Sequence, residues 1–173
     1  MAKQELDYRE CLAETVQALG EGRVLLASKG KGGKPNAMAI GWGTIGLIWG
    51  KPIFLVFVRP SRYTYRLIEE GGEFTVNVLP ASMREVVTYC GSVSGRDQDK
   101  LKEKGLTALA SDKVSTPIIG EGIVHFECRV VHTNDVAPAA LDEHIQANCY
   151  SGGDFHRLYF GEILSCRRDT SPQ

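Results

Sequence analysis

Residues 59–65, which read Arg-Pro-Ser-Arg-Tyr-Thr-Tyr, combine the side chains that bind a phosphate group. They follow a β-branched and aromatic run at 53–58, which predicts a buried strand. They lead into a helical pattern at 64–70 that ends at two glycines. A helix start offers free backbone N–H groups and a positive dipole end to an anion, and arginine adds a bidentate donor. This stretch therefore predicts a phosphate-binding turn with two hydroxyls and two guanidinium groups.

The same turn also fits a plainer interpretation. A serine three residues before a threonine at a helix start is ordinary N-capping, and Arg59 and Arg62 could be solvated surface charges. The heptapeptide alone leaves both interpretations open.

Length and composition favour a globular protein without nucleic-acid or membrane partners. The 173 residues suggest one domain over 1–173, with 20 basic and 21 acidic side chains and a formal net charge of −1. No basic run or aromatic-interleaved patch points to nucleic acid. The apolar runs are too short to span a bilayer, and the polar start of the chain does not resemble a signal peptide. We therefore expect a soluble cytoplasmic protein.

The cysteine pattern agrees with a reducing compartment. The chain has five cysteines, an odd number, and no pair is spaced Cys-x-x-Cys. A zinc site or a disulfide framework is therefore not expected. Cys128 falls in an expected strand and is interpreted as a small buried hydrophobe.

The elements that must position the turn are mostly short strands. An apolar spacing of three and four predicts an amphipathic helix over 5–19, with Tyr8, Leu12, Val16 and Leu19 on its buried face. Strands are expected at 23–28, 36–42, 53–58, 73–79, 123–131 and 158–164, and further helices at 64–70, 82–89 and 97–104. Residues 105–122 are expected to be irregular, and the tail 167–173 mobile. This hairpin-like order favours a mainly β fold, a closed or partly closed antiparallel barrel with peripheral helices, over a doubly wound sheet.

Two features inside the strands suggest close contact with a ligand. Gly41, Gly43 and Gly46 mark either a bulge or a place where a flat ring approaches the backbone. Alternation in the strand at 73–79 places Asn77 on the face opposite its apolar residues. That amide is either solvated or a ligand contact.

Five segments in order resemble the flavin reductase-like family, the FMN-binding split barrels that include flavoredoxin. They are Pro-Asn-Ala-Met-Ala-Ile-Gly-Trp at 35–42, Arg-Pro-Ser-Arg-Tyr-Thr at 59–64, Glu-Phe-Thr-Val-Asn at 73–77, Cys-Gly-Ser-Val-Ser-Gly-Arg-Asp-Gln-Asp-Lys at 90–100 and Leu-Tyr-Phe-Gly-Glu-Ile at 158–163. Together they cover the chain from about residue 20 to 165. The resemblance implies a split antiparallel Greek-key barrel and a homodimer, with FMN in a groove near the subunit interface.

The resemblance also implies roles for single residues. Ser61, Arg62 and Thr64 would bind the phosphate, with Arg59 as a second cation. Asn36 and the backbone of Ala37, Met38 and Ala39 would run along the isoalloxazine ring. Asn77 would reach the phosphate or the ribityl chain. Trp42, Trp49 and Tyr63 could flank a ring, but we assign them to the core, because aromatic residues beside glycines in a barrel usually pack there.

A second set of residues would face the substrate. Arg96 and Lys100, from the Ser-Gly-Arg-Asp loop, would cap the flavin, meet the partner subunit or bind the phosphates of a dinucleotide. The family's Asp-His segment before the last strand is altered here. His156 is therefore preferred over His144 because it lies closest to that strand.

Two functions follow from these residues. The first is an NAD(P)H-dependent flavin reductase that passes hydride to FMN and electrons onward to free flavin, ferric iron or an oxygenase. The second is a flavoredoxin-like electron carrier that holds FMN tightly and exchanges electrons with a redox partner protein. The missing Rossmann glycine fingerprint does not separate them, since split-barrel reductases lack it.

Overall fold

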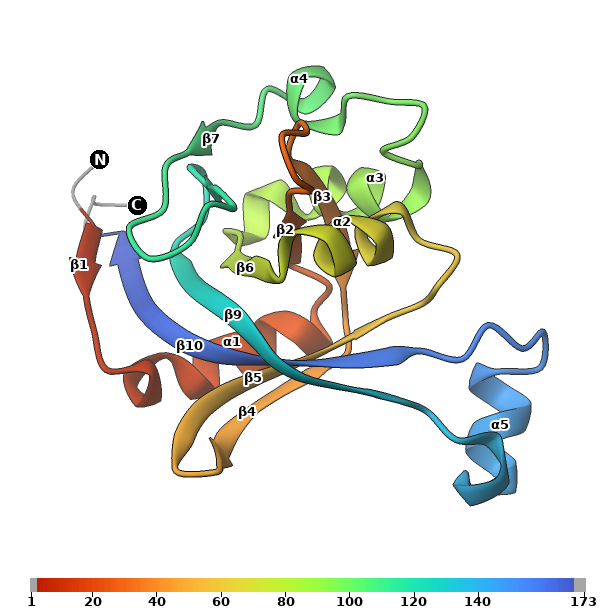
Figure 1. Cartoon of the computed structure of the whole chain (residues 1–173). Helices are drawn as coiled ribbons and strands as arrows, with labels where there is room; N and C mark the ends of the chain where they lie inside the picture. The colour runs from red at the N-terminus through yellow and green to blue at the C-terminus, as the bar shows by residue number, and fades with distance from the viewer. Residues whose placement is uncertain (1–2, 170–173) are drawn as a thin grey trace.

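A computed structural model describes residues 3–169 (Figure 1). Eight strands form one antiparallel sheet in the order β3-β2-β6-β9-β10-β5-β4, with β1 added at β10. Within the part described, its end strands β3 and β4 do not pair with each other, so the sheet curls into a barrel that is not closed. The expected antiparallel barrel with peripheral helices is confirmed.

The strands and helices alternate irregularly along the chain. The strands are β1 (Lys3–Glu5), β2 (Val24–Ser28), β3 (Asn36–Ile40), β4 (Gly43–Ile48), β5 (Lys51–Val58), β6 (Glu73–Val78), β7 (Ala108–Leu109), β8 (Ile118–Ile119), β9 (Val124–Asp135) and β10 (Arg157–Asp169). The helices are η1 (Tyr8–Cys11), α1 (Leu12–Gly20), α2 (Tyr63–Gly71), η2 (Ala81–Met83), α3 (Arg84–Ser92), α4 (Lys100–Lys104), η3 (Pro138–Ala140) and α5 (Glu143–Cys149). Strand β4 and helix α5 were not expected from the sequence.

The first expected helix is shorter than predicted and turns a different face to the core. Asp7 caps the 3₁₀ turn η1 in a capping box, and α1 begins only at Leu12. Glu5, the first residue of the expected helix, instead ends β1, because the edge of β10 offers this segment backbone partners. Thr15 and Ala18 are fully buried, whereas Val16 is 57% exposed, so the predicted position of Val16 is wrong.

The end of the chain also differs from expectation. Residues 167–169, predicted to be mobile, continue β10 and pair with both β9 and β1. Strong cross-strand hydrogen bonding on both sides explains why this segment is ordered. The rest of the predicted tail, 170–173, lies outside the described residues.

Strands β9 and β10 are the longest and carry the curvature of the barrel. Their register shifts at Phe160/Gly161 and again at Ile163/Ser165. A Cβ at Gly161 would overlap the Phe74 ring and the Cβ of Cys128, so the first bulge requires glycine. Beyond the barrel these strands extend toward α5, which lies away from the other helices (Figure 1).

Apolar side chains fill both the barrel and the layer beside it. Phe54 and Phe126 meet edge to face inside the barrel, with ring centroids 5.3 Å apart. A second cluster, including Leu25, Val87 and Leu101, packs α3 and α4 against β2 and β3. Cys128 is buried and all five cysteines are free, as expected. Among the described residues, the helices are all too short or too polar to cross a bilayer.

Candidate functional site

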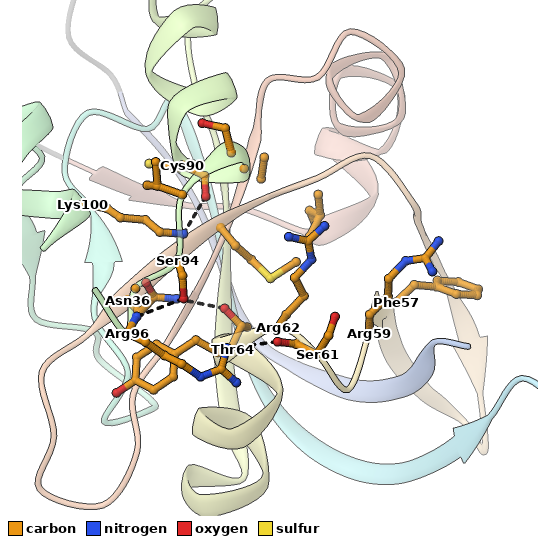
Figure 2. Close-up of a pocket in the computed structure, with 18 of the residues that line it drawn as sticks. Asn36, Phe57, Arg59, Ser61, Arg62, Thr64, Cys90, Ser94, Arg96 and Lys100 are labelled. Carbon is orange, nitrogen blue, oxygen red and sulfur yellow. Dashed lines mark hydrogen bonds between the residues drawn. The ribbon is translucent and has the colours of Figure 1, made fainter. Parts of the chain in front are cut away.

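A cavity of about 390 Å³ lies beside the opening between β3 and β4. One wall is β3 with the turn after it, a second is the start of α2, and a third is the loop that follows α3 (Figure 2). Ten of its lining residues are Asn36, Met38, Ala39, Trp42, Phe57, Arg62, Thr64, Gly95, Lys100 and His156. Segments far apart in the sequence thus meet at the place where the sheet is open.

The start of α2 presents unpaired donors to this cavity. Arg62 is the N-cap residue, with extended backbone angles, and no side chain makes a cap hydrogen bond to the helix. The N-capping interpretation of the Ser-x-x-Thr pattern is therefore wrong. The first N–H groups of a helix have no partner within the helix, so this end can receive an anion.

Thr64 and Asn36 fix the position of the helix start against β3. Thr64 is buried, and its Oγ1 accepts a hydrogen bond of 2.9 Å from Asn36 Nδ2. Gly95 passes so close that a Cβ there would overlap the Asn36 amide. The predicted residues Asn36 and Thr64 are thus brought together from segments 28 residues apart.

The two arginines of the turn differ in their contacts with the rest of the chain. Arg62 is exposed and lines the cavity, and the part of the chain that the structure describes shows no ion pair to its guanidinium. Arg59 also lines the cavity, but it donates to the carbonyl oxygens of Cys149, Gly153 and Asp154 at 2.8 to 3.3 Å. The expected role of Arg59 as a second cation stays a prediction, and its guanidinium also holds the segment before β10.

Lys100 provides a buried positive charge at the cavity wall. Its side chain is buried, and Nζ donates to the carbonyl oxygens of Cys90 at 2.6 Å and Ala37 at 3.1 Å (Figure 2). No carboxylate among the described residues forms an ion pair with it. Burial lowers the pKa of Lys100 and raises the pKa of the neighbouring Cys90 thiol. The cysteine is therefore neutral and not an activated nucleophile.

The opposite end of the cavity is aromatic. Trp42 lies 5.0 Å from the His156 ring, and Phe57 lies 6.0 Å from it, centroid to centroid. His156 Nδ1 is 2.8 Å from the Tyr150 hydroxyl. Burial, and then the charge of Arg59, lowers the pKa of His156 to about 4, so its imidazole is neutral near pH 7. His144 is exposed on α5, so the choice of His156 over it agrees with the geometry.

Two predicted residues point elsewhere. Asn77 is fully buried on the other side of β6, where its Oδ1 accepts from the Ile119 N–H and lies 2.9 Å from His125 Nδ1. The polar face of β6 is covered by the segment around β8, so this amide completes the core and the proposed flavin contact is wrong. Ala37 lies in β3, but its side chain belongs to the second apolar cluster, and its carbonyl oxygen accepts a hydrogen bond from Lys100 Nζ.

The sequence reasoning missed part of the aromatic wall. Trp42 and Tyr63 were expected in the core, yet both line the cavity and Trp42 is 45% exposed. Phe57 was not singled out at all. The available signal was their position near element ends: Trp42 lies between β3 and β4, Phe57 is the second-last residue of β5, and Tyr63 is the first residue of α2.

Comparison with known proteins agrees with this arrangement. The family model described as "Flavin reductase like domain" matches residues 16–173. The chain belongs to the flavin reductase-like family. The family that the five motifs indicated and the split-barrel fold are therefore confirmed.

Several known proteins are similar to this chain over most of its length. An uncharacterised protein of Archaeoglobus fulgidus is 34% identical over 131 residues, which cover 76% of this chain and 64% of that protein. Flavoredoxin from Methanosarcina acetivorans is 30% identical with a TM-score of 0.68, covering 85% of this chain and 68% of its own. Flavoredoxin of Desulfovibrio vulgaris is 26% identical with the same TM-score, covering 85% and 69%. The chain thus spans about two thirds of the length of these relatives.

The donor set of the cavity fits a flavin mononucleotide. The uncapped helix start and Arg62 suit a phosphate dianion, and Lys100 adds a cation without a carboxylate partner. The aromatic side chains at the other end suit a planar ring.

Proposed function

We propose that this protein binds FMN in the cavity, with the phosphate at the start of α2. The observation that carries the proposal is the helix start that no side chain caps, with Arg62 free beside it, facing a cavity with aromatic walls. When bound, FMN would supply hydride-accepting and electron-donating chemistry. Ser61, Arg62, Thr64 and the first N–H groups of α2 would hold the phosphate, and Met38 and Ala39 would form the wall along the ring.

The activity we infer is that of an NAD(P)H-dependent flavin reductase. A second cavity of about 300 Å³ adjoins the first and shares Asn36, Tyr63, Arg96 and Lys100 with it. Arg96 is exposed there and suits a phosphate of a second nucleotide, and Lys34, which pairs with Asp99 at 3.7 Å, is a second exposed cation. The neutral His156, oriented by Tyr150, would position a ligand at the aromatic end without adding charge.

The electron carrier is the second candidate function. It is favoured by the two flavoredoxins among the similar structures, at 26% and 30% identity. The two functions differ in whether pyridine nucleotides reduce the bound flavin directly.

An absorption spectrum of the purified protein, followed by anaerobic addition of NADH or NADPH, tests both. We expect a flavin spectrum that either nucleotide bleaches within seconds. A flavin spectrum indifferent to both would favour the electron carrier. A colourless protein that does not take up added FMN would overturn the cofactor proposal itself.

Arg96 offers a test of the nucleotide site. Its guanidinium is exposed, donates 3.0 Å to the Ser61 carbonyl and lies over the Tyr63 ring. We expect Arg96→Ala to raise the KM for pyridine nucleotide about tenfold, because one charge-assisted phosphate contact contributes about 1.5–3 kcal/mol. FMN affinity should change less than about threefold, since the lost bond to Ser61 is exposed.

Steady-state kinetics and an FMN titration would measure both effects. Lys102→Ala, which removes an exposed cation on α4, the short helix that follows the Arg96 loop, is the matched control. An unchanged KM in Arg96→Ala would remove this loop from the nucleotide site.

We also propose that the protein forms a homodimer. Leu47 and Trp49 are 68% and 61% exposed beside the turn between β4 and β5, and Trp49 packs against His132 and Phe160. An apolar patch of this kind is typical of a protein interface. Sedimentation equilibrium should give twice the chain mass, and Trp49→Lys should shift the equilibrium toward monomer. A monomer in the unaltered protein at micromolar concentration would contradict the proposal.

A further inference from the structure

A carboxylate of the protein itself binds the turn just before α2. Asp154 Oδ2 accepts a hydrogen bond of 2.6 Å from the Ser61 hydroxyl, and Oδ1 accepts one of 3.3 Å from the Ser61 N–H. Ser61 immediately precedes the N-cap residue of α2. Asp154 therefore uses two donors of the turn in the way an external anion would.

The Ser61 hydroxyl cannot serve both anions. It has a single proton to donate, and a carboxylate and a phosphate dianion both act as acceptors. Two negative groups around one hydroxyl also repel each other. Binding of a phosphate by Ser61 therefore requires the Asp154 carboxylate to leave.

The backbone holds Asp154 in this position. Arg59 donates to the carbonyl oxygens of Cys149, Gly153 and Asp154 and lies 5.1 Å from the Tyr150 ring centroid. Gly153 and Asp154 adopt positive φ angles of 75° and 53°, which are rare for a residue other than glycine. The segment then enters the cavity wall at His156. The turn is therefore held at several points and places the Asp154 carboxylate at the end of the cavity where we propose that the phosphate binds.

We propose that Asp154 competes with the flavin phosphate for Ser61 and so sets how fast flavin leaves the protein. The inference rests on the proposed FMN site and deepens it: the cofactor would be an exchangeable flavin, of the kind a reductase releases to another acceptor. The FMN phosphate would have to displace the Asp154 carboxylate from Ser61 in order to bind there.

Asp154→Asn tests the proposal with almost no change of shape. The amide carries no charge and can turn an N–H toward a phosphate. We expect FMN to dissociate about fivefold more slowly and to bind about fivefold more tightly, the effect of one unit charge about 4 Å away in water. Riboflavin, which has no phosphate, should bind equally well to both proteins.

Stopped-flow fluorescence of flavin release measures these rates. Asp97→Asn, which removes an exposed carboxylate from the loop after α3, controls for a general loss of negative charge. In a Ser61→Ala background the gain from Asp154→Asn should become smaller, because the shared hydroxyl is gone and only the charge repulsion remains.

The possible outcomes separate a failure of the Asp154 competition from a failure of the proposed flavin site. Equal FMN release from the unaltered protein and Asp154→Asn overturns the competition, as does an equal gain for riboflavin or for Asp97→Asn. If neither FMN nor riboflavin binds to any of these proteins, the proposed flavin site itself is wrong.

Discussion

Replacing Ser61 and Arg62 together by alanine is expected to weaken FMN binding by about 30-fold or more, since one charge-assisted hydrogen bond contributes about 1.5–3 kcal/mol. Arg62 lines the cavity and has no ion pair among the described residues, so its charge is available to a phosphate. Both side chains are exposed, and neither caps α2, so the fold should lose less than about 1 kcal/mol. The loss should be confined to ligands that carry a phosphate.

Fluorescence titration with FMN and with riboflavin would measure the effect, alongside thermal unfolding of the unliganded proteins. Arg66→Ala is the matched control, because it removes an exposed arginine one turn further along α2. The double variant should lose the preference for FMN over riboflavin, whereas Arg66→Ala should keep it. A double variant that still purifies yellow would show that the phosphate lies elsewhere.

Glu127→Ala is expected to destabilise the fold by about 3–5 kcal/mol, the usual cost of removing one partner of a buried ion pair. The Glu127 side chain is 1% exposed in β9 and pairs with Arg167 of β10, which is 12% exposed. It also accepts hydrogen bonds from the N–H groups of Asp112 and Lys113, at 2.6 to 3.2 Å. Its loss would leave Arg167 Nη2 and two backbone N–H groups without their acceptor, although Arg167 Nη1 keeps its ion pair with Asp112 at 2.7 Å.

Urea unfolding followed by circular dichroism measures this free energy. Glu70→Ala removes the carboxylate of an exposed i, i+4 pair with Arg66 and should cost less than about 0.5 kcal/mol. If Glu127→Ala does not fold, Glu127→Gln, which loses the charge but keeps one of the two acceptor oxygens, should unfold at an intermediate urea concentration. Equal midpoints for the Glu127 and Glu70 variants would mean that the buried pair adds no net stability.

The sequence alone identified the phosphate-binding turn as a candidate, because its chemistry is local. The apolar strand at 53–58, the turn and the helix start are contiguous, so the spacing of Ser61, Arg62 and Thr64 already places them at a helix N-terminus. The family and its barrel were also recognisable, since five short motifs occur in order along the chain. Chain periodicity was enough for most strands, whose bounds the structure shifts by a few residues.

Only the tertiary structure decided which of these polar groups face the cavity. Alternation in β6 separates Asn77 from the apolar face, but it cannot show that the segment around β8 covers the polar face. Arg59 and Arg62 look alike in the sequence, yet one is bound to carbonyl groups about 90 residues later and the other is free for a ligand. Asp154 reaches Ser61 across 93 residues of chain. Such contacts form only when the barrel fold brings distant segments together, and no local pattern of residues predicts which distant segments will meet.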